Sequence, residues 1–140
     1  MRTTMSFAGT RETMEAYVKS LLSFGDYSSY LADEVTITLM GTDREVKGRE
    51  AARQFIDFLH QQAFRTDNQV RNLVVGDNIA MAEIEFVGTH IGEFEGIAAT
   101  NRQVRVPYAV AYDLEDGKIT TLRLYFPMQL LLQQLGSGSQ

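Results

Sequence analysis

The chain has 140 residues, of which 44% are hydrophobic and 22% are charged, and its formal net charge is −5. This length predicts one domain with a single core, and the composition is that of an ordinary globular protein. No apolar run approaches the roughly 20 residues that span a bilayer, and the first residues lack the apolar core of a secretory signal. We therefore expect no membrane partner and a cytoplasmic location.

Cysteine is absent, and histidine occurs only at His60 and His90. These counts exclude disulfides, thiolate metal sites and a cysteine nucleophile, and two histidines are too few for a histidine-rich metal centre. We predict no metal and no cofactor. The basic residues are scattered among acidic ones, and the net charge is negative, which argues against nucleic-acid binding. A small, uncharged and apolar molecule is the partner that this composition favours.

The first half of the chain predicts two helices and a strand. Apolar residues at helical spacing indicate a helix over residues 10–24, with Thr10 at its N-cap. Residues 25–34 are rich in turn formers, and β-branched residues then alternate up to Gly41, which predicts a short helix or turn followed by a strand. The apolar stripe that follows Gly48 predicts a second helix.

The second half of the chain changes to a hydrophobic period of two, which predicts long strands. We expect three of them, the first broken at residues 76–78, over residues 69–90, 103–114 and 118–126. Asp116-Gly117 supplies the tight turn between the last two strands, because this pair tolerates positive φ angles.

Helices followed by a strand meander predict an α+β fold in which the helices pack on a strongly curved antiparallel sheet. We expect one domain over residues 1–136, and the Gly-Ser-rich residues 137–140 predict a flexible tail.

Three short segments carry a resemblance to a known family: GTHIGEFEGI at residues 88–97, DGKI at 116–119 and QLG at 134–136. Together they resemble the SnoaL-like polyketide cyclases and ester cyclases of the nuclear-transport-factor-two-like superfamily. The resemblance implies a cone-shaped, cystatin-like or ketosteroid-isomerase-like roll with a pocket for a small apolar or aromatic carbonyl compound. It also implies a homodimer that forms through the outer face of the sheet.

The chain departs from this family where the family carries acids. Aromatic-polyketide cyclases of this type place an acid on the long strand before the Asp-Gly turn, where this chain has Val110. Many relatives have Asp ahead of the last helix, where Pro127 stands here. Residues 122–127, LRLYFP, are also similar to the Trp-Arg-Asp-Tyr-Phe-Asp segment of limonene epoxide hydrolases, whose two acids fall on Leu124 and Pro127.

These departures leave three functions open. The first is a cofactor-free cyclase or isomerase that transfers a proton next to a carbonyl group. The second is a non-catalytic module that binds a small ligand or dimerises, which the missing acids favour. The third is an epoxide hydrolase, which needs carboxylates to activate water and is weakened by the same absences.

Strand parity predicts which side chains face the pocket, because alternate residues of a strand point to opposite faces. His90 shares the inner face and is expected near the rim, where an imidazole can act as general acid or base. Its alternative role is structural, as a hydrogen-bond partner of the loop over residues 91–101. The same parity predicts an apolar wall, or else a filled core, made by Phe86, Val106, Tyr108, Val110, Tyr112, Leu122, Leu124 and Phe126.

The remaining polar candidates lie on the helices and on the outer sheet face. Tyr17 and Tyr30 are expected to bring phenol groups to a ligand carbonyl, or else to form hydrogen bonds within the core. Asp57 and His60 lie three residues apart and predict a surface pair on the second helix rather than a catalytic dyad. Outward parity predicts cross-strand ion pairs among Glu83, Glu85, Arg105, Asp113 and Arg123.

Overall fold

The computed structural model describes residues 7–136; the expected tail at 137–140 lies outside the described residues. In chain order the elements are α1 (Phe7–Leu22), the 3-10 helix η1 (Tyr27–Tyr30), β1 (Leu31–Leu39), β2 (Glu45–Lys47), α2 (Arg49–Asp57), the π-helical segment η2 (Phe58–Gln62), β3 (Phe64–Thr66), β4 (Gln69–Val75), β5 (Ile79–His90), β6 (Gln103–Glu115), β7 (Lys118–Tyr125) and α3 (Met128–Gln134). None of the described helices is long and apolar enough to cross a membrane.

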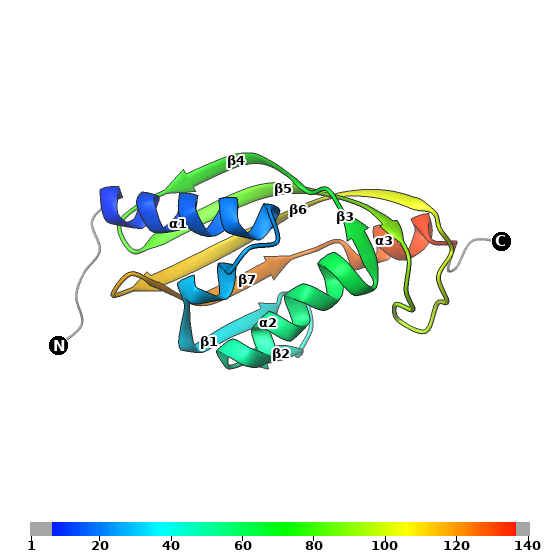
Figure 1. The fold of residues 1–140 in the computed structure, drawn as a ribbon, viewed down its shortest axis with the longest axis horizontal. Coiled ribbons are helices and arrows are strands. Elements are labelled where there is room, and N and C mark those ends of the chain that lie inside the picture. The colour runs from blue at the N-terminus through cyan, green and yellow to red at the C-terminus, as the bar shows by residue number, and fades with distance from the viewer. Residues whose placement is uncertain (1–6, 137–140) are drawn as a thin grey trace.

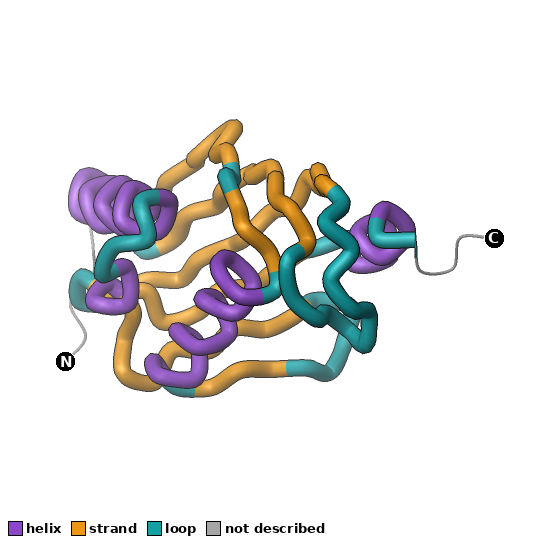
Figure 2. The backbone as a smooth tube through the Cα atoms, turned by 45° about the vertical axis from the view of Figure 1, so that its right-hand side comes forward, coloured by secondary structure: helices purple, strands orange, loops and turns teal. Residues whose placement is uncertain are grey.

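Seven strands form one strongly curled sheet in the order β2-β1-β7-β6-β5-β3, and β4 also pairs with β5. Figures 1 and 2 show α1 and α2 across the same concave face, with α3 at one end of the sheet. The α+β prediction is therefore confirmed. The sheet is mixed rather than purely antiparallel, because β1 runs parallel to β7.

The long strands match the hydrophobic period closely. β5 alternates exposed or half-buried residues with buried ones over its whole length, and β6 pairs with it antiparallel from Gln103↔Thr89 to Asp113↔Ile79. The turn between β6 and β7 holds Asp116 at a φ of 51° and Gly117 at 78°, the left-handed values that the Asp-Gly pair predicts.

The N-cap prediction for Thr10 is wrong, because α1 begins three residues earlier at Phe7. Thr10 lies fully buried inside the helix, and its hydroxyl accepts a hydrogen bond from the backbone N–H of Asn78 at 3.1 Å. The side chain thus ties α1 to the turn between β4 and β5.

The inner face of the sheet carries two hydrophobic clusters. One lies beneath α1 and α2 and includes Met14, Tyr17 and Tyr112. The other lies toward α3 and includes Phe64 and Phe86. Tyr108 packs against both clusters, which places it at the junction of the two halves of the core.

The end of the second helix is locked to the loop between β5 and β6. The helix continues past Asp57 as the π-helical segment η2, and the backbone N–H groups of Ile91 and Gly92 both donate to the Ala63 carbonyl just beyond it, at 2.9 and 3.0 Å. A Cβ atom on Gly92 would lie 2.4 Å from the Gln62 carbonyl oxygen. Only glycine allows this close approach.

We expect Gly92→Ala to lower the free energy of unfolding by about 1–3 kcal/mol, because a backbone must move to relieve the overlap. Urea denaturation measures the change. Gly76→Ala is the matched control: its Cβ would meet the Cγ2 methyl group of Ile79 at 3.1 Å and no backbone atom closer than 3.9 Å, so its effect should stay within about 1 kcal/mol. Equal stability of the two variants would contradict the close-packing argument.

Candidate functional site

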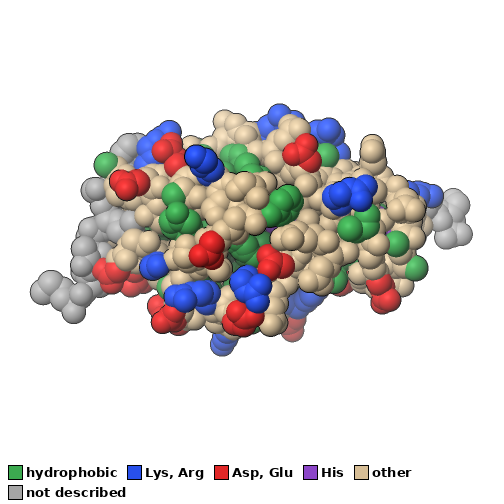
Figure 3. Space-filling model, in the orientation of Figure 1, with side chains coloured by type: hydrophobic (Ala, Val, Ile, Leu, Met, Phe, Trp, Pro, Cys, Tyr) green, Lys and Arg blue, Asp and Glu red, His purple; other side chains and the backbone are tan. Residues whose placement is uncertain are grey.

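A cavity of about 240 Å³ lies between the concave sheet face and the helices. Its walls come from α1, β1, the α2–η2 helix, the strands β5 to β7, α3 and the loop after β5, and nearly all the side chains that line it are apolar. The volume lies just below the roughly 300–1,000 Å³ of typical small-molecule sites. In Figure 3, hydrophobic side chains gather in the middle of the helical face, among charged side chains. The shape and lining suit a compact, apolar ligand.

Most of the side chains expected to contact a ligand, from the sheet or from the helices, line this cavity: Tyr17, Phe86, Tyr108, Val110, Tyr112, Leu122, Leu124 and Phe126. Two expected members do not. Tyr30 packs against the cluster beneath α1 and α2, and Val106 is fully buried in the cluster toward α3. Parity places a residue on the correct face of a strand, but neighbouring elements decide whether that side chain reaches the cavity or is packed over.

His90 lies outside the cavity, although it has the inward parity that the sequence predicts. Its ring is fully buried beside Phe64, with ring centroids 5.2 Å apart. The backbone N–H of Thr100 donates to its Nδ1 at 3.2 Å. The short strand β3, which the sequence pattern does not reveal, pairs Phe64 with His90 and covers this end of β5. These contacts are the ones that the structural alternative for His90 predicts, while its Nε2 is buried without a hydrogen-bond partner among residues 7–136.

His60, which the sequence places on the surface, lines the cavity instead. Its Nδ1 lies 2.7 Å from the Ile56 carbonyl oxygen. A carbonyl oxygen only accepts hydrogen bonds, so in the neutral ring the proton sits on Nδ1, and Nε2 carries the lone pair. This Nε2 is buried and has no hydrogen-bond partner among residues 7–136.

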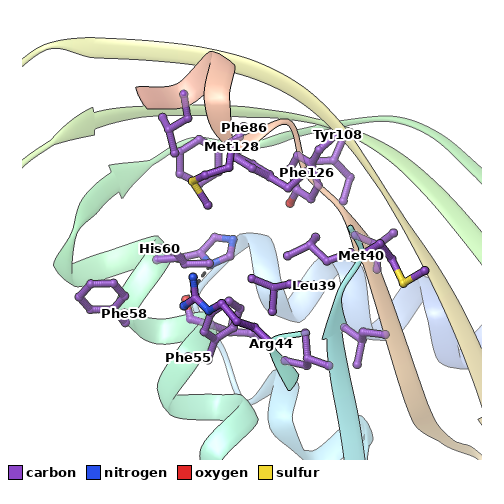
Figure 4. Close-up of a pocket in the computed structure, with 18 of the residues that line it drawn as sticks. Leu39, Met40, Arg44, Phe55, Phe58, His60, Phe86, Tyr108, Phe126 and Met128 are labelled. Carbon is purple, nitrogen blue, oxygen red and sulfur yellow. Dashed lines mark hydrogen bonds between the residues drawn. The ribbon is translucent and has the colours of Figure 1, made fainter. Parts of the chain in front are cut away.

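The surroundings of His60 favour its neutral form. Burial lowers the pKa of His60 below 6.5, while the bond to the Ile56 carbonyl and the nearby Asp57 carboxylate act in the opposite direction with smaller effects. The imidazole is therefore unprotonated at neutral pH. Figure 4 shows it reaching from the helix toward Phe86 on the opposite wall, and the two ring centroids are 6.4 Å apart.

Asp57 does not contact His60 in the way a catalytic dyad would. It accepts a hydrogen bond from the Tyr27 hydroxyl at 2.7 Å and pairs with the Arg53 guanidinium at 3.0 Å. Both partners hold the carboxylate in place within one helical turn of His60. Its negative charge would stabilise the imidazolium if His60 took up a proton.

Three phenol groups add donors to the cavity. Tyr17, Tyr108 and Tyr112 all line it. The rings of Tyr17 and Tyr112 meet edge to face with centroids 5.9 Å apart. Burial raises the pKa of all three phenols well above the usual value, so they stay protonated as hydrogen-bond donors.

The cavity opens between two loops. Its exposed lining residues are Met40, Thr42 and Arg44 from the segment joining β1 to β2, and Glu95 from the loop that joins β5 to β6. We call these four residues the entrance. Arg44 and Glu95 bring the charges to an otherwise apolar lining. No three His, Asp or Glu side chains among residues 7–136 come together as metal ligands would.

Comparison with known structures shows that the curled sheet and its helices form a half-barrel of the SnoaL-like and ketosteroid-isomerase-like folds. A protein from Jannaschia sp. CCS1 assigned to the SnoaL-like polyketide cyclases is 19% identical, over 95% of this chain and 94% of that one, with a TM-score of 0.82. TsrD from Streptomyces laurentii is 23% identical, over 95% and 98% of the two chains, with a TM-score of 0.78. An LEH-like epoxide hydrolase of M. tuberculosis is 15% identical, over 94% and 92%, with a TM-score of 0.71.

The family model described as SnoaL-like polyketide cyclase matches residues 11–135. The chain therefore belongs to the SnoaL-like polyketide cyclase family, which confirms the resemblance carried by the three short motifs. No curated protein sequence matches it at a significant level.

The depressed pKa of His60 predicts a pH-dependent contribution to stability. An imidazole that ionises less readily in the folded than in the unfolded state stabilises the fold fully above pH 6.5 and loses this contribution as the pH falls through its folded-state pKa. We expect the free energy of unfolding of the wild type to fall by more than that of His60→Gln when the pH is lowered from about 7.5 to about 5.5. Urea unfolding of both proteins at both pH values tests this. The carboxylates titrate equally in the two proteins, so their contribution cancels in the comparison. A pH-independent difference would show that His60 is not held neutral.

Proposed function

We propose that the chain binds a compact apolar carbonyl compound in the cavity and transfers a proton next to the carbonyl without a cofactor, as the first step of a cyclisation or isomerisation. The observation that carries the proposal is the buried Nε2 of His60, which has no hydrogen-bond partner among residues 7–136, in a cavity that three phenol side chains also line. Proton abstraction of this kind needs a base near the carbon and donors near the carbonyl oxygen.

The roles divide between the imidazole and the phenols. The lone pair on Nε2 of His60 takes the proton from the carbon next to the carbonyl, and the electron pair left behind moves onto the carbonyl oxygen. The phenols of Tyr17, Tyr108 and Tyr112 stay protonated and donate to that oxygen as its charge grows. The imidazolium is stabilised by the Ile56 carbonyl and by Asp57, and it returns the proton in a later step.

Epoxide hydrolysis has less support from this cavity, although one similar structure is named as an epoxide hydrolase. That reaction needs a carboxylate to activate water, and Glu95 at the entrance is the one carboxylate among the lining residues described. The acid positions of relatives, Val110 and Leu124, are apolar here and line the cavity. The chemistry available inside is therefore that of an imidazole and phenols.

Deuterium exchange into 2-tetralone, a compact bicyclic ketone with acidic protons next to the carbonyl, tests the proposal directly. We expect the wild type to accelerate exchange in D₂O followed by NMR, and His60→Gln to lose about 100-fold or more of the acceleration. Removal of one donor to the oxyanion costs about 100-fold in rate in other enzymes. Tyr108→Phe should reduce the acceleration of exchange by less than this, because two phenols remain.

Tyr30→Phe is the matched control for the phenols, because Tyr30 lies outside the cavity lining; its exchange rate should equal that of the wild type. Binding of 2-tetralone without accelerated exchange would instead support the non-catalytic binding module. Unchanged exchange in His60→Gln would remove His60 from the mechanism.

We also propose that two copies associate through the outer face of the sheet. Exposed apolar side chains lie there side by side on neighbouring strands: Val74 is paired with Met81 in the sheet register, and both are exposed, by 66% and 43%. Cross-strand ion pairs lie on the same face and bring charges of both signs to it, including Arg105 with Glu85 and Arg123 with Asp113. A surface with apolar residues and both charges can complement a second copy of itself across a two-fold axis.

We expect Met81→Glu to convert a dimer to a monomer, because it places a charge at the centre of the proposed contact. Size-exclusion chromatography with light scattering gives the mass. Leu22→Glu, at a site of similar exposure (40%) on α1, is the matched control and should leave the dimer intact. A monomeric wild type would contradict the proposal.

A further inference from the structure

Arg44 is the one positively charged side chain among the residues described as lining the cavity. The turn that carries it is fixed by several hydrogen bonds. The Arg44 backbone N–H donates to the Thr42 hydroxyl at 3.0 Å, that hydroxyl donates to the Leu39 carbonyl at 2.7 Å, and the Leu39 N–H donates to the Arg44 carbonyl at 3.1 Å. The backbone is therefore positioned, and Figure 4 shows the Arg44 side chain extending toward the helical wall that carries Phe55 and His60.

Within residues 7–136 the Arg44 guanidinium donates no hydrogen bond, and the carboxylate that it pairs with is that of Glu95, with Nη1 and Oε2 3.9 Å apart. Other arginines are engaged: Arg53 bonds to Asp57 at 3.0 Å, and Arg123 bonds to Asp113 at 2.6 Å. A guanidinium presents five N–H donors in a planar fork that matches a carboxylate. At Arg44 this fork is available at the entrance of an apolar cavity.

Glu95 reaches the entrance from a second tight turn. Glu95 and Gly96 have φ angles of 49° and 79°, and the flanking Phe94 and Ile97 exchange two backbone hydrogen bonds of 2.9 and 2.8 Å. This is a two-residue hairpin turn in which both central residues are left-handed, a conformation that favours Asn-Gly over Glu-Gly. Phe94 is buried beneath it and lines the cavity, so the turn holds the Glu95 backbone at the opening.

The contact between these two charges is weak. Their separation of 3.9 Å exceeds hydrogen-bond length, and the side chains are 54% and 41% exposed. Water screens such a pair, so breaking it costs little. A ligand carboxylate anchored by an apolar body inside the cavity would meet Arg44 at shorter range and with two parallel hydrogen bonds, while Glu95 turns out into solvent.

We propose that the ligand carries a carboxylate at the end facing the entrance, where Arg44 binds it in place of Glu95. The inference rests on the proposed function and narrows its substrate class to compact apolar carbonyl compounds with an acidic group. It assigns Arg44 the role of a specificity-determining residue and Glu95 that of a competing anion. It also replaces the uncharged ligand that the net charge of the chain favours with a ligand that carries one negative charge.

The test compares two probes that share one body and differ in charge: 6-acetyl-2-naphthoate and its primary amide, both titrated against the full chain by NMR or by the fluorescence of the naphthyl group. We expect the wild type to bind the acid about fivefold more tightly than the amide. Arg44→Gln should reduce this ratio to about one by weakening only the acid. Glu95→Gln should raise the ratio, because the competing carboxylate is gone.

Arg11→Gln is the matched control, since it removes one positive charge at an exposed ion pair on α1 outside the cavity lining; it should leave the ratio unchanged. Thermal melts verify that each variant is folded. A wild-type ratio of about one, or a ratio that survives Arg44→Gln, would overturn the inference while leaving the proposed function intact. Failure of both probes to bind would instead count against the proposed ligand site, and the two failures are thereby distinguished.

Discussion

The Ala63 carbonyl holds together the two elements that close the cavity. It accepts the backbone N–H groups of Ile91 and Gly92 at 2.9 and 3.0 Å, which fastens the loop after β5 to the end of the π-helical segment. That segment carries His60, and that loop carries Glu95. The position of the imidazole and the width of the entrance therefore depend on the same short contact, and Gly92 permits it by having no side chain.

The π-helical geometry has a direct consequence for the chemistry. Where an α-helix changes to π, the backbone hydrogen-bond pattern lengthens by one residue, and such insertions occur often at functional sites. Here the imidazole itself bonds to the Ile56 carbonyl, one helical turn back. Because that bond fixes the proton on Nδ1, a single backbone group sets the tautomer of His60, the one imidazole among the described residues that line the cavity.

The sequence was sufficient for the framework because β5 alternates between buried and more exposed residues over its whole length, and β6 alternates over its first half. Strand parity located the wall from Phe86 to Phe126, and the Asp116-Gly117 turn set the pairing of β6 with β7. It was insufficient for β3, which has only three residues and no readable period. Without β3 the burial of His90 could not be foreseen, so parity alone left it at the rim of the pocket.

His60 left a weaker signal that could have been used. It follows Ile56 of the predicted apolar stripe by four residues, so a helix places both on one face. Its pairing with Asp57 suggested a surface position, yet Asp57 is held by Tyr27 and Arg53 instead. The entrance could not be inferred in the same way, because Arg44 and Glu95 lie 51 positions apart on two turns that only the folded chain brings together.

The apolar residues at the family's acid positions acquire a meaning from this arrangement. Val110 and Leu124 belong to the sheet wall, whereas His60 belongs to the helical wall that faces it. The base that we propose therefore lies across the cavity from the two positions at which relatives carry acids, so the imidazole does not simply take the place of either carboxylate.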